Sequence, residues 1–246
     1  MTDLRLTRRR LLFSTAPGVL GITVLAGCSS SGPSPSATTP PPSPVPAASG
    51  AVAGDWRRVA MSYVSAYILV RGSEVAIVDL GLAGSGPAIE EGLKAAGQDW
   101  RSVKHIVLTH LHDDHVGGLA EIAPQVNAAI YAGEGDLPSI ISPKPLKPLK
   151  DGDDLFGMKV VNTPGHTLGH ISLFEPATGI LVAGDALRTE SGLAGSNPEF
   201  TADETKANDS VRRLAGLDVK AILCGHGEPL VAGAGPALKE LAAGLK

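Results

Sequence analysis

Histidine and aspartate are concentrated at residues 110–115, which read His-Leu-His-Asp-Asp-His. Such side chains are costly to bury without partners, so the stretch is a poor candidate for a hydrophobic core. Neutral imidazole nitrogens and carboxylate oxygens are, however, the usual ligands of zinc and neighbouring divalent metals. A solvated loop that is merely rich in histidine is the alternative. We interpret the stretch as part of a metal site, because the rest of the chain supplies further ligands.

Three more side chains of the same kind stand alone later in the chain: His166, Asp185 and His226. Each lies next to a glycine, where the backbone can turn tightly, and each follows a short apolar run that predicts a strand. Together with the first stretch, they form four loops at strand ends that deliver histidine and aspartate. This is the arrangement expected of one shared metal centre.

These residue types predict hydrolysis of an acyl bond. Three histidines around one ion leave an open coordination position, and an ion there lowers the pKa of a bound water toward neutrality. A second ion, held partly by carboxylates, would fix the resulting hydroxide and neutralise the charge that develops on the substrate. Asp114 is the catalytic candidate, because its carboxylate could orient the hydroxide or carry a proton to the leaving group.

The elements that must position these side chains are short and occur in two groups of strands, each followed by helices. Strands are expected at residues 57–61, 66–71, 74–79, 105–108, 128–131, 158–162, 171–174, 180–183 and 219–223. Helices are expected at 87–96, 118–122, 202–214 and 236–245. Residues 142–150, with three prolines, are expected to form an irregular loop. This order predicts two packed sheets with helices outside.

The histidine-rich stretch resembles the signature H-x-H-x-D-H of the metallo-β-lactamase superfamily, which is matched by His110, His112, Asp114 and His115. The resemblance continues through the three later single-residue motifs and through Asp79 in the family's early D-x-G turn. It covers the chain from about residue 55 to 246. It implies an α/β fold, the αββα sandwich, with two mixed β-sheets, helices on the outer faces and a metal site at one edge.

The resemblance also implies how the ligands divide between two ions. The ligands implied for the first ion are His110, His112 and His166, and those for the second are Asp114, His115 and His226. Asp185 would bridge the two ions. Two zinc ions per chain are expected, with iron or manganese as alternatives.

With aspartate at position 185, the sequence resembles the glyoxalase II-like thioesterases and lactonases, which use aspartate as the bridging residue. The lactamases of the superfamily often carry cysteine or serine near this position. The tyrosine that follows the bridging aspartate in some lactonases is missing, because Ala186-Leu187-Arg188 stands there. Arg188 could bind an anionic substrate, although an exposed loop charge is the interpretation that we prefer.

The function expected is that of a metal-dependent hydrolase that opens an ester, thioester, lactone or amide bond of a small molecule. One alternative is an iron-dependent redox enzyme of the same fold, similar to persulfide dioxygenases. Another is a non-catalytic metal-binding protein. A serine hydrolase is not favoured, because the chain has no G-x-S-x-G motif. The substrate and the oligomeric state do not follow from the sequence.

Residues 1–27 have the features of a bacterial export signal. The paired Arg8-Arg9 resemble a twin-arginine signal, and Leu25-Ala26-Gly27-Cys28 resembles a lipobox, after which Cys28 would carry lipid. An uncleaved anchor is the alternative. Residues 28–53 are rich in proline and serine and are expected to be a linker, and residues 54–246 the metallo-β-lactamase-fold domain. We expect an exported protein, lipid-anchored to the outer face of the bacterial cell membrane or on its periplasmic side.

Composition and charge exclude several kinds of partner and site. The net charge of −4 provides no basic stripe, so nucleic acid is not an expected partner. With two cysteines, neither a disulfide framework nor a CxxC zinc site is available. His105, His170, Asp113 and Cys224 lie near the candidate ligands in the sequence, and we interpret them as structural or solvent-facing.

Overall fold

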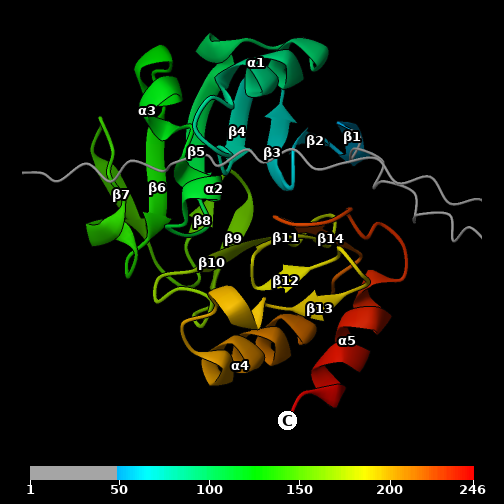
Figure 1. Cartoon of the computed structure of the whole chain (residues 1–246). Coiled ribbons are helices and arrows are strands. Elements are labelled where there is room, and N and C mark those ends of the chain that lie inside the picture. Colours follow the sequence, from blue (N-terminus) through cyan, green and yellow to red (C-terminus); the bar gives the residue numbers. More distant parts are fainter. Residues whose placement is uncertain (1–48) are drawn as a thin grey trace, which may run out of the picture. The chain divides into compact units, whose positions relative to one another are not determined.

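A computed structural model describes residues 49–246 of the 246-residue chain (Figure 1). The predicted signal peptide at residues 1–27, the predicted lipid site at Cys28 and most of the predicted linker lie outside the described residues. Within residues 49–246, no helix combines the length and the apolar character that crossing a membrane would require.

Two mixed sheets form the centre of the fold. The first contains, in spatial order, β1 (Gly50–Ala53), β2 (Trp56–Met61), β3 (Val64–Arg71), β4 (Glu74–Val78), β5 (Val103–Leu108), β6 (Ala129–Gly133) and β7 (Leu146–Leu149). Its first four strands are antiparallel, and β4 to β7 run parallel. The spatial order therefore follows the chain from one edge to the other.

The second sheet has five strands in the order β14 (Ala221–Cys224), β11 (Ile180–Gly184), β10 (Ile171–Glu175), β9 (Met158–Asn162) and β8 (Asp154–Leu155). Only the pair β11 and β14 is parallel. A separate small ribbon pairs β12 (Leu187–Arg188) with β13 (Ala194–Gly195). Both large sheets are thus mixed, as the resemblance implied.

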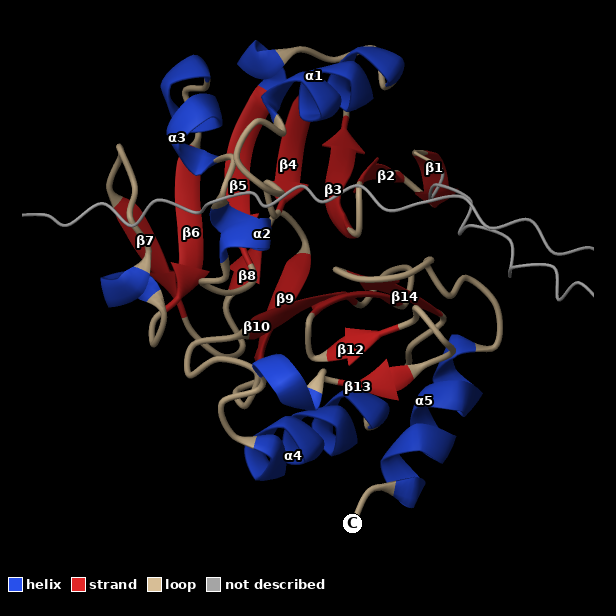
Figure 2. Ribbon diagram, viewed as in Figure 1, coloured by secondary structure: helices blue, strands red, loops and turns tan. Residues whose placement is uncertain are grey.

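Helices cover the outer faces of the two sheets (Figure 2). The helices α1 (Gly86–Ala95) and α3 (Leu119–Ile122) share a buried apolar cluster with the first sheet. The helices α4 (Glu204–Ala215) and α5 (Ala234–Gly244) share another cluster with the second sheet. One short helix, α2 (Asp113–Val116), follows β5 and carries part of the histidine-rich stretch. The predicted αββα layering is confirmed.

The pleat of each strand divides its side chains between two cores. On β3, Tyr67 and Leu69 face the second sheet, whereas Ala66 and Ile68 pack beneath the helices. All four are buried, because β3 is covered on both faces. The sequence of β3 therefore contains a continuous apolar run. A strand with one solvent-exposed face would alternate apolar and polar residues.

Most of the strands and helices predicted from the sequence are present, with ends displaced by a few residues. The expectation of an irregular loop at 142–150 is wrong, because β7 pairs with β6 there. Pro148 is tolerated in β7, since an edge strand has one side without ladder partners. The strand β1 also occupies the last residues of the segment expected to be linker.

Replacing Ile77 by alanine tests the layered core. Ile77 is fully buried in β4, in the apolar cluster that the first sheet shares with α1 and α3, so the substitution should lower the free energy of unfolding by about 3 kcal/mol through lost transfer energy and a residual cavity. Urea denaturation measures this difference. Ile141→Ala is the matched control, because Ile141 is 94% exposed and should change the free energy by less than about 0.5 kcal/mol. Equal effects of the two substitutions would contradict the burial assigned to β4.

Candidate metal centre

The candidate ligands gather where strands of both sheets end. His110 follows β5, Asp185 follows β11 directly and His226 follows β14. Because β11 and β14 are parallel, their carboxyl ends reach the same edge, where the Gly225 amide donates to the Gly184 carbonyl at 3.1 Å. Residues far apart in the sequence are thereby brought together.

Backbone hydrogen bonds also join the two sheets at this edge. The amide of Ile171 in β10 donates to the carbonyl of Thr109, just after β5, at 2.9 Å. The amide of Ser65 in β3 donates to the carbonyl of Gly225, just after β14, at 2.9 Å. The loops that carry the histidines therefore have fixed positions relative to one another.

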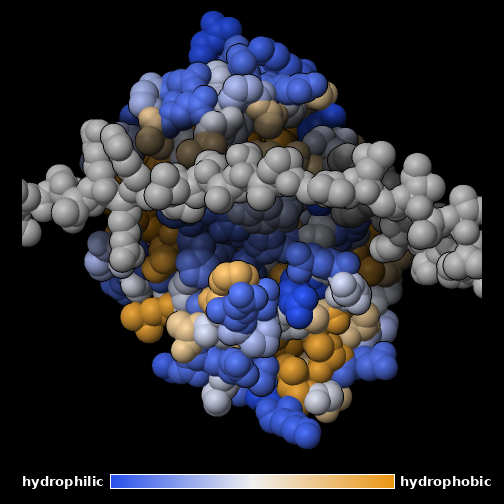
Figure 3. Space-filling model, viewed as in Figure 1, coloured by the Kyte–Doolittle hydropathy of each residue, from blue (hydrophilic) through white to orange (hydrophobic). Residues whose placement is uncertain are grey.

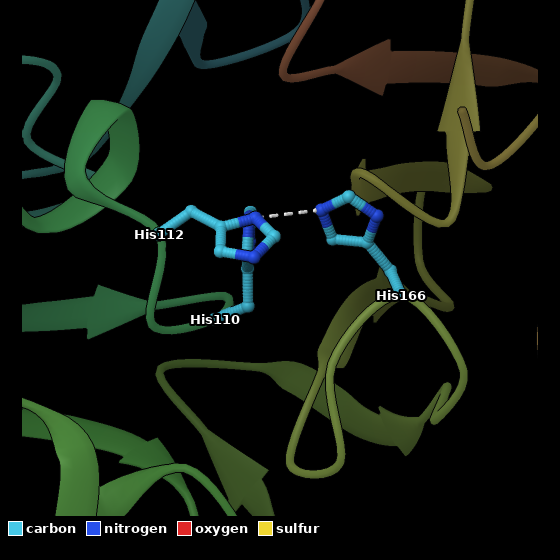
Figure 4. A group of neighbouring side chains, drawn as sticks. All are labelled: His110, His112 and His166. Carbon is cyan, nitrogen blue, oxygen red and sulfur yellow. Dashed lines mark hydrogen bonds between the residues drawn. The ribbon is translucent and has the colours of Figure 1, made fainter. Parts of the chain in front are cut away.

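The first donor group consists of three histidines. The Nδ1 atom of His112 lies 3.1 Å from Nε2 of His110 and 2.9 Å from Nε2 of His166. Figure 4 shows the rings of His112 and His166 pointing toward each other from two different segments of the chain. All three nitrogens lie within 4.8 Å of one another, a separation that suits three ligands of one ion.

The second donor group combines Asp114, His115 and His226. The Oδ2 atom of Asp114 lies 3.3 Å from Nε2 of His226 and 3.9 Å from Nε2 of His115. The helix α2 presents Asp114 and His115, while His226 approaches from the second sheet.

Asp185 lies between the two groups. Its Oδ2 is 3.4 Å from Nε2 of His166 in the first group and 3.1 Å from Nε2 of His226 in the second. Its Oδ1 is 3.3 Å from Nε2 of His115. The structure thus brings together all seven side chains that the sequence nominated, and their assignment as ligands stays a prediction.

Two buried atoms of the centre have no hydrogen-bond partner among residues 49–246: Nε2 of His115 and Oδ1 of Asp185. Buried polar atoms nearly always have a partner, so an unpartnered nitrogen facing an unpartnered carboxylate oxygen requires an explanation. A divalent ion between them would satisfy both. The donor set of this centre therefore fits a metal.

Electrostatics in the centre suit a cation. Burial lowers the pKa of His166 to about 4 and holds that of His110 well below its ordinary value, so both imidazoles are in the neutral form that binds metals. Burial alone would raise the pKa of Asp185, but the adjacent His115 and His226 lower it well below its usual range. The ionised carboxylate favours positive charge around it, which a divalent ion supplies.

The centre opens into a cavity of about 370 Å³. Besides ligand side chains, its walls contain Tyr63, Arg188, Glu190, Asn197 and Phe200. In the view of Figure 3, hydrophilic residues lie in a recess between the upper and lower halves of the domain. Arg188 belongs to this wall with a side chain that is 30% exposed, so the interpretation of it as an exposed loop charge is wrong.

A sequence profile of the metallo-beta-lactamase superfamily matches residues 61–226, well over half of the chain. The chain belongs to the metallo-beta-lactamase superfamily. The matched range contains all seven candidate ligands.

Two proteins named as hydrolases are similar to the chain. The chain is 28% identical over 201 residues to the probable metallo-hydrolase YflN of Bacillus subtilis, a match that covers 63% of this chain and 75% of YflN. It is 36% identical over 158 residues to a hydroxyacylglutathione hydrolase of Pseudomonas putida, covering 61% of this chain and 56% of that enzyme. The chain therefore spans little more than half the length of this second relative.

A solved structure shows the same fold. The crystal structure of a metallo-beta-lactamase family protein from Thermus thermophilus aligns with a TM-score of 0.63 at 26% identity, covering 76% of this chain and 77% of the other. Together with the donor groups, these matches show that the chain is a metallo-hydrolase of the metallo-β-lactamase fold.

Asp79 positions one of the candidate ligands, His115. Its Oδ2 lies 2.8 Å from Nδ1 of His115, and its carboxylate accepts hydrogen bonds from the amide and hydroxyl of Thr109 at 2.7 and 2.8 Å. A carboxylate on the far nitrogen of a histidine fixes the tautomer and the direction of the ring. The backbone of Asp79 has φ of +62°, a conformation that aspartate tolerates better than most residues.

The residues that the sequence analysis set apart from the ligands also have places in the structure. The Nε2 atom of His170 accepts a hydrogen bond from the amide of Asp185 at 3.0 Å, and burial lowers the pKa of His170 to about 3. His105 packs its ring against Phe156, and Cys224 is buried. Within the described part of the chain, none of these side chains is in a donor group.

Asp136 is a supporting residue that sequence reasoning missed. Its carboxylate is fully buried and accepts hydrogen bonds from the Leu111 amide at 3.0 Å, the Thr167 hydroxyl at 2.6 Å and the Gly169 amide at 2.6 Å. These bonds join the loop of His110 and His112 to the loop of His166. Residue 136 lies in an ordinary turn after a strand, and no local pattern indicated this role.

Replacing Asp136 by alanine tests that connection. Two buried amides would lose their acceptor, so the metal-free protein should lose about 3 kcal/mol of unfolding free energy, and metal affinity should fall about 10- to 100-fold. Denaturant titration and chelator competition measure the two quantities. Asp113→Ala is the control, since Asp113 directly follows His112 at the start of α2 and is exposed. Unchanged metal affinity in Asp136→Ala would contradict the positioning role.

Proposed function

We propose that the protein is a dizinc hydrolase that cleaves an ester, thioester, lactone or amide bond of a small molecule. The observation that carries the proposal is the position of Asp185, whose carboxylate contacts both donor groups beside an open cavity. Zinc is favoured by a first group made only of histidines, with further histidine and carboxylate in the second.

Two ions held by these groups would supply an activated water and a Lewis acid for the scissile carbonyl. The protein's own part is to fix the geometry and manage the proton. His112, Asp114 and His166 line the cavity and would face a bound substrate. Loops joined across both sheets allow little displacement of these side chains.

Asp114 is the residue that we assign to proton movement. Burial would raise the pKa of its carboxyl, but the hydrogen bond with His226 lowers it, so the group is ionised near neutral pH. Its side chain lines the cavity, where the carboxylate could orient the attacking water or carry a proton from that water to the leaving group.

The choice of acyl substrates is supported by an aspartate at position 185, which the lactamases often lack, and by similarity to a hydroxyacylglutathione hydrolase. The paired Arg8-Arg9 and the sequence before Cys28 support a further proposal, that the enzyme is exported and tethered by lipid on Cys28. Its partners would then be a small substrate and the membrane.

A substrate panel with metal quantitation tests the proposed activity. Thioesters, lactones and β-lactams are offered to the purified protein and to His112→Ala. We expect about two zinc ions per chain. We also expect turnover that falls more than about 100-fold in the variant, since even outer partners of a metal ligand contribute about 10- to 100-fold.

Asp113→Ala serves as the control at the neighbouring position, and it should retain activity because the Asp113 side chain is exposed. Iron in place of zinc, together with oxygen consumption, would contradict hydrolysis and favour a redox enzyme. Turnover of no substrate above the His112→Ala background would favour a metal-binding protein without catalysis.

A further inference from the structure

Arg58 is a charged residue in the apolar interior between the two sheets. It is 3% exposed and lies opposite Tyr67 in the register of β2 and β3. It also stands two residues after Trp56, which packs between the sheets, so the pleat of β2 points the Arg58 side chain toward the second sheet. A charge at such a position costs free energy unless hydrogen bonds compensate it, and the contacts of Arg58 therefore indicate its role.

The guanidinium joins the first sheet to the loop that carries His226. Its Nε donates to Oγ of Ser65 in β3 at 2.8 Å. One terminal nitrogen donates to the carbonyl of Gly227 at 2.7 Å, and the other donates to the carboxylate of Glu228 at 2.5 Å. Two of the three acceptors thus belong to the residues that directly follow His226, and the planar fork fixes their direction as well as their distance.

The turn of the same β2–β3 hairpin holds the His226 ring itself. The Nδ1 atom of His226 donates to the carbonyl of Tyr63 at 2.9 Å, which leaves Nε2 to face Asp114 of the second donor group. The Tyr63 ring also stacks on His226, with centroids 5.8 Å apart and planes 8° from parallel. The direction of the His226 ring therefore depends on how residues 225–228 lie against this hairpin.

The first donor group is held in a different way. The three acceptors of Arg58 lie outside the loops that carry His110, His112 and His166. Those loops are joined to each other through the carboxylate of Asp136. A change at Arg58 should therefore act on one donor group and spare the other.

We propose that Arg58 is a positioning residue for the second metal ion, which it serves by fixing residues 225–228 so that Nε2 of His226 faces Asp114 and His115. The proposal rests on the proposed two-ion centre and adds the group that orients one of its ligands. Arg58 is not among the residues that line the cavity, so its effect on metal binding passes through His226.

Zinc competition with a chromophoric chelator tests the proposal in Arg58→Gln. The variant should bind zinc about 10- to 100-fold more weakly at the second donor group, the size expected when an outer support of a metal-binding histidine is removed, and within about twofold of native at the first. Arg58→Lys should recover part of the lost affinity, because it keeps the charge without the fork.

Cadmium-113 NMR identifies which ion is affected. The two donor groups differ in their ligands, so each bound cadmium should give its own resonance. At limiting cadmium, Arg58→Gln should keep the same resonance as His226→Ala, in which a ligand of the second group is removed outright. Loss of the resonance that His226→Ala retains would overturn the proposal.

Arg71→Gln is the matched control for loss of a buried arginine. Arg71 stands at the opposite end of β3 from Ser65, and its guanidinium likewise donates to a carboxylate and a backbone carbonyl, those of Glu175 and Phe156. It should lower the urea midpoint of unfolding, as Arg58→Gln does, and leave both zinc affinities unchanged. Equal weakening of both ions in Arg58→Gln would assign Arg58 to general stability and overturn the positioning role.

Glu228→Ala tests the same contact with less risk to folding, because the Glu228 side chain is 65% exposed. It removes one of the three acceptors and should weaken the second ion about threefold, the size of a partly exposed ion pair. Added to Arg58→Gln, it should weaken the second ion no further, since both substitutions break one connection. Full additivity would contradict a shared connection through Arg58.

The native protein distinguishes this proposal from the proposed function. Two ions in the native protein, both retained with native affinity by Arg58→Gln, would overturn the positioning role and leave the dizinc hydrolase standing. A single ion in the native protein would contradict the dizinc hydrolase itself, and the role of Arg58 would be overturned with it.

Discussion

The carboxylate of Asp185 is the group around which the site is built. It is buried, its pKa is held well below the usual range, and it lies within 3.4 Å of imidazole nitrogens from three different segments of the chain. A buried charge of this kind is tolerated only when it is compensated, either by protonated histidine or by metal ions. The histidines of both donor groups face this one carboxylate, so the loss of its charge would affect the two groups together.

Close approach at this point depends on glycine and on the meeting of two sheets. A Cβ atom at Gly225 would lie 2.3 Å from Oδ1 of Asp185, and one at Gly184 would lie 2.7 Å from Nε2 of His170. Both glycines adjoin the ends of parallel strands, where they give the ligand loops room to come together. The strand pairing that builds the second sheet therefore also places the ligands.

Much of this centre could be predicted from the sequence, because its ligands are rare residue types at the ends of apolar runs. The resemblance to the superfamily signature implied the first group, His110, His112 and His166, without a structure. The role of Asp136 could not be predicted, since its partners lie 25 to 33 residues away and an aspartate in a turn has no distinguishing pattern. Arg188 was misjudged for the same reason, because the ribbon that carries it into the cavity has only two residues in each strand.

The fold shows the same division between local and distant information. Strands covered on both faces are continuous apolar runs and were found easily. The edge strand β7 contains Pro148, and its identity as a strand depends on the neighbouring β6 more than on its own residues. Local chemistry predicts elements and ligands, whereas supporting residues depend on tertiary contacts.

Metal stoichiometry in Asp185→Asn tests the central claim most directly. Asparagine preserves the shape of the side chain but removes the charge that both donor groups share. Competition with a chromophoric chelator should show two ions bound per chain of the native protein, and in the variant weaker binding at both donor groups. Two ions bound by Asp185→Asn with undiminished affinity would contradict a centre organised by one shared carboxylate.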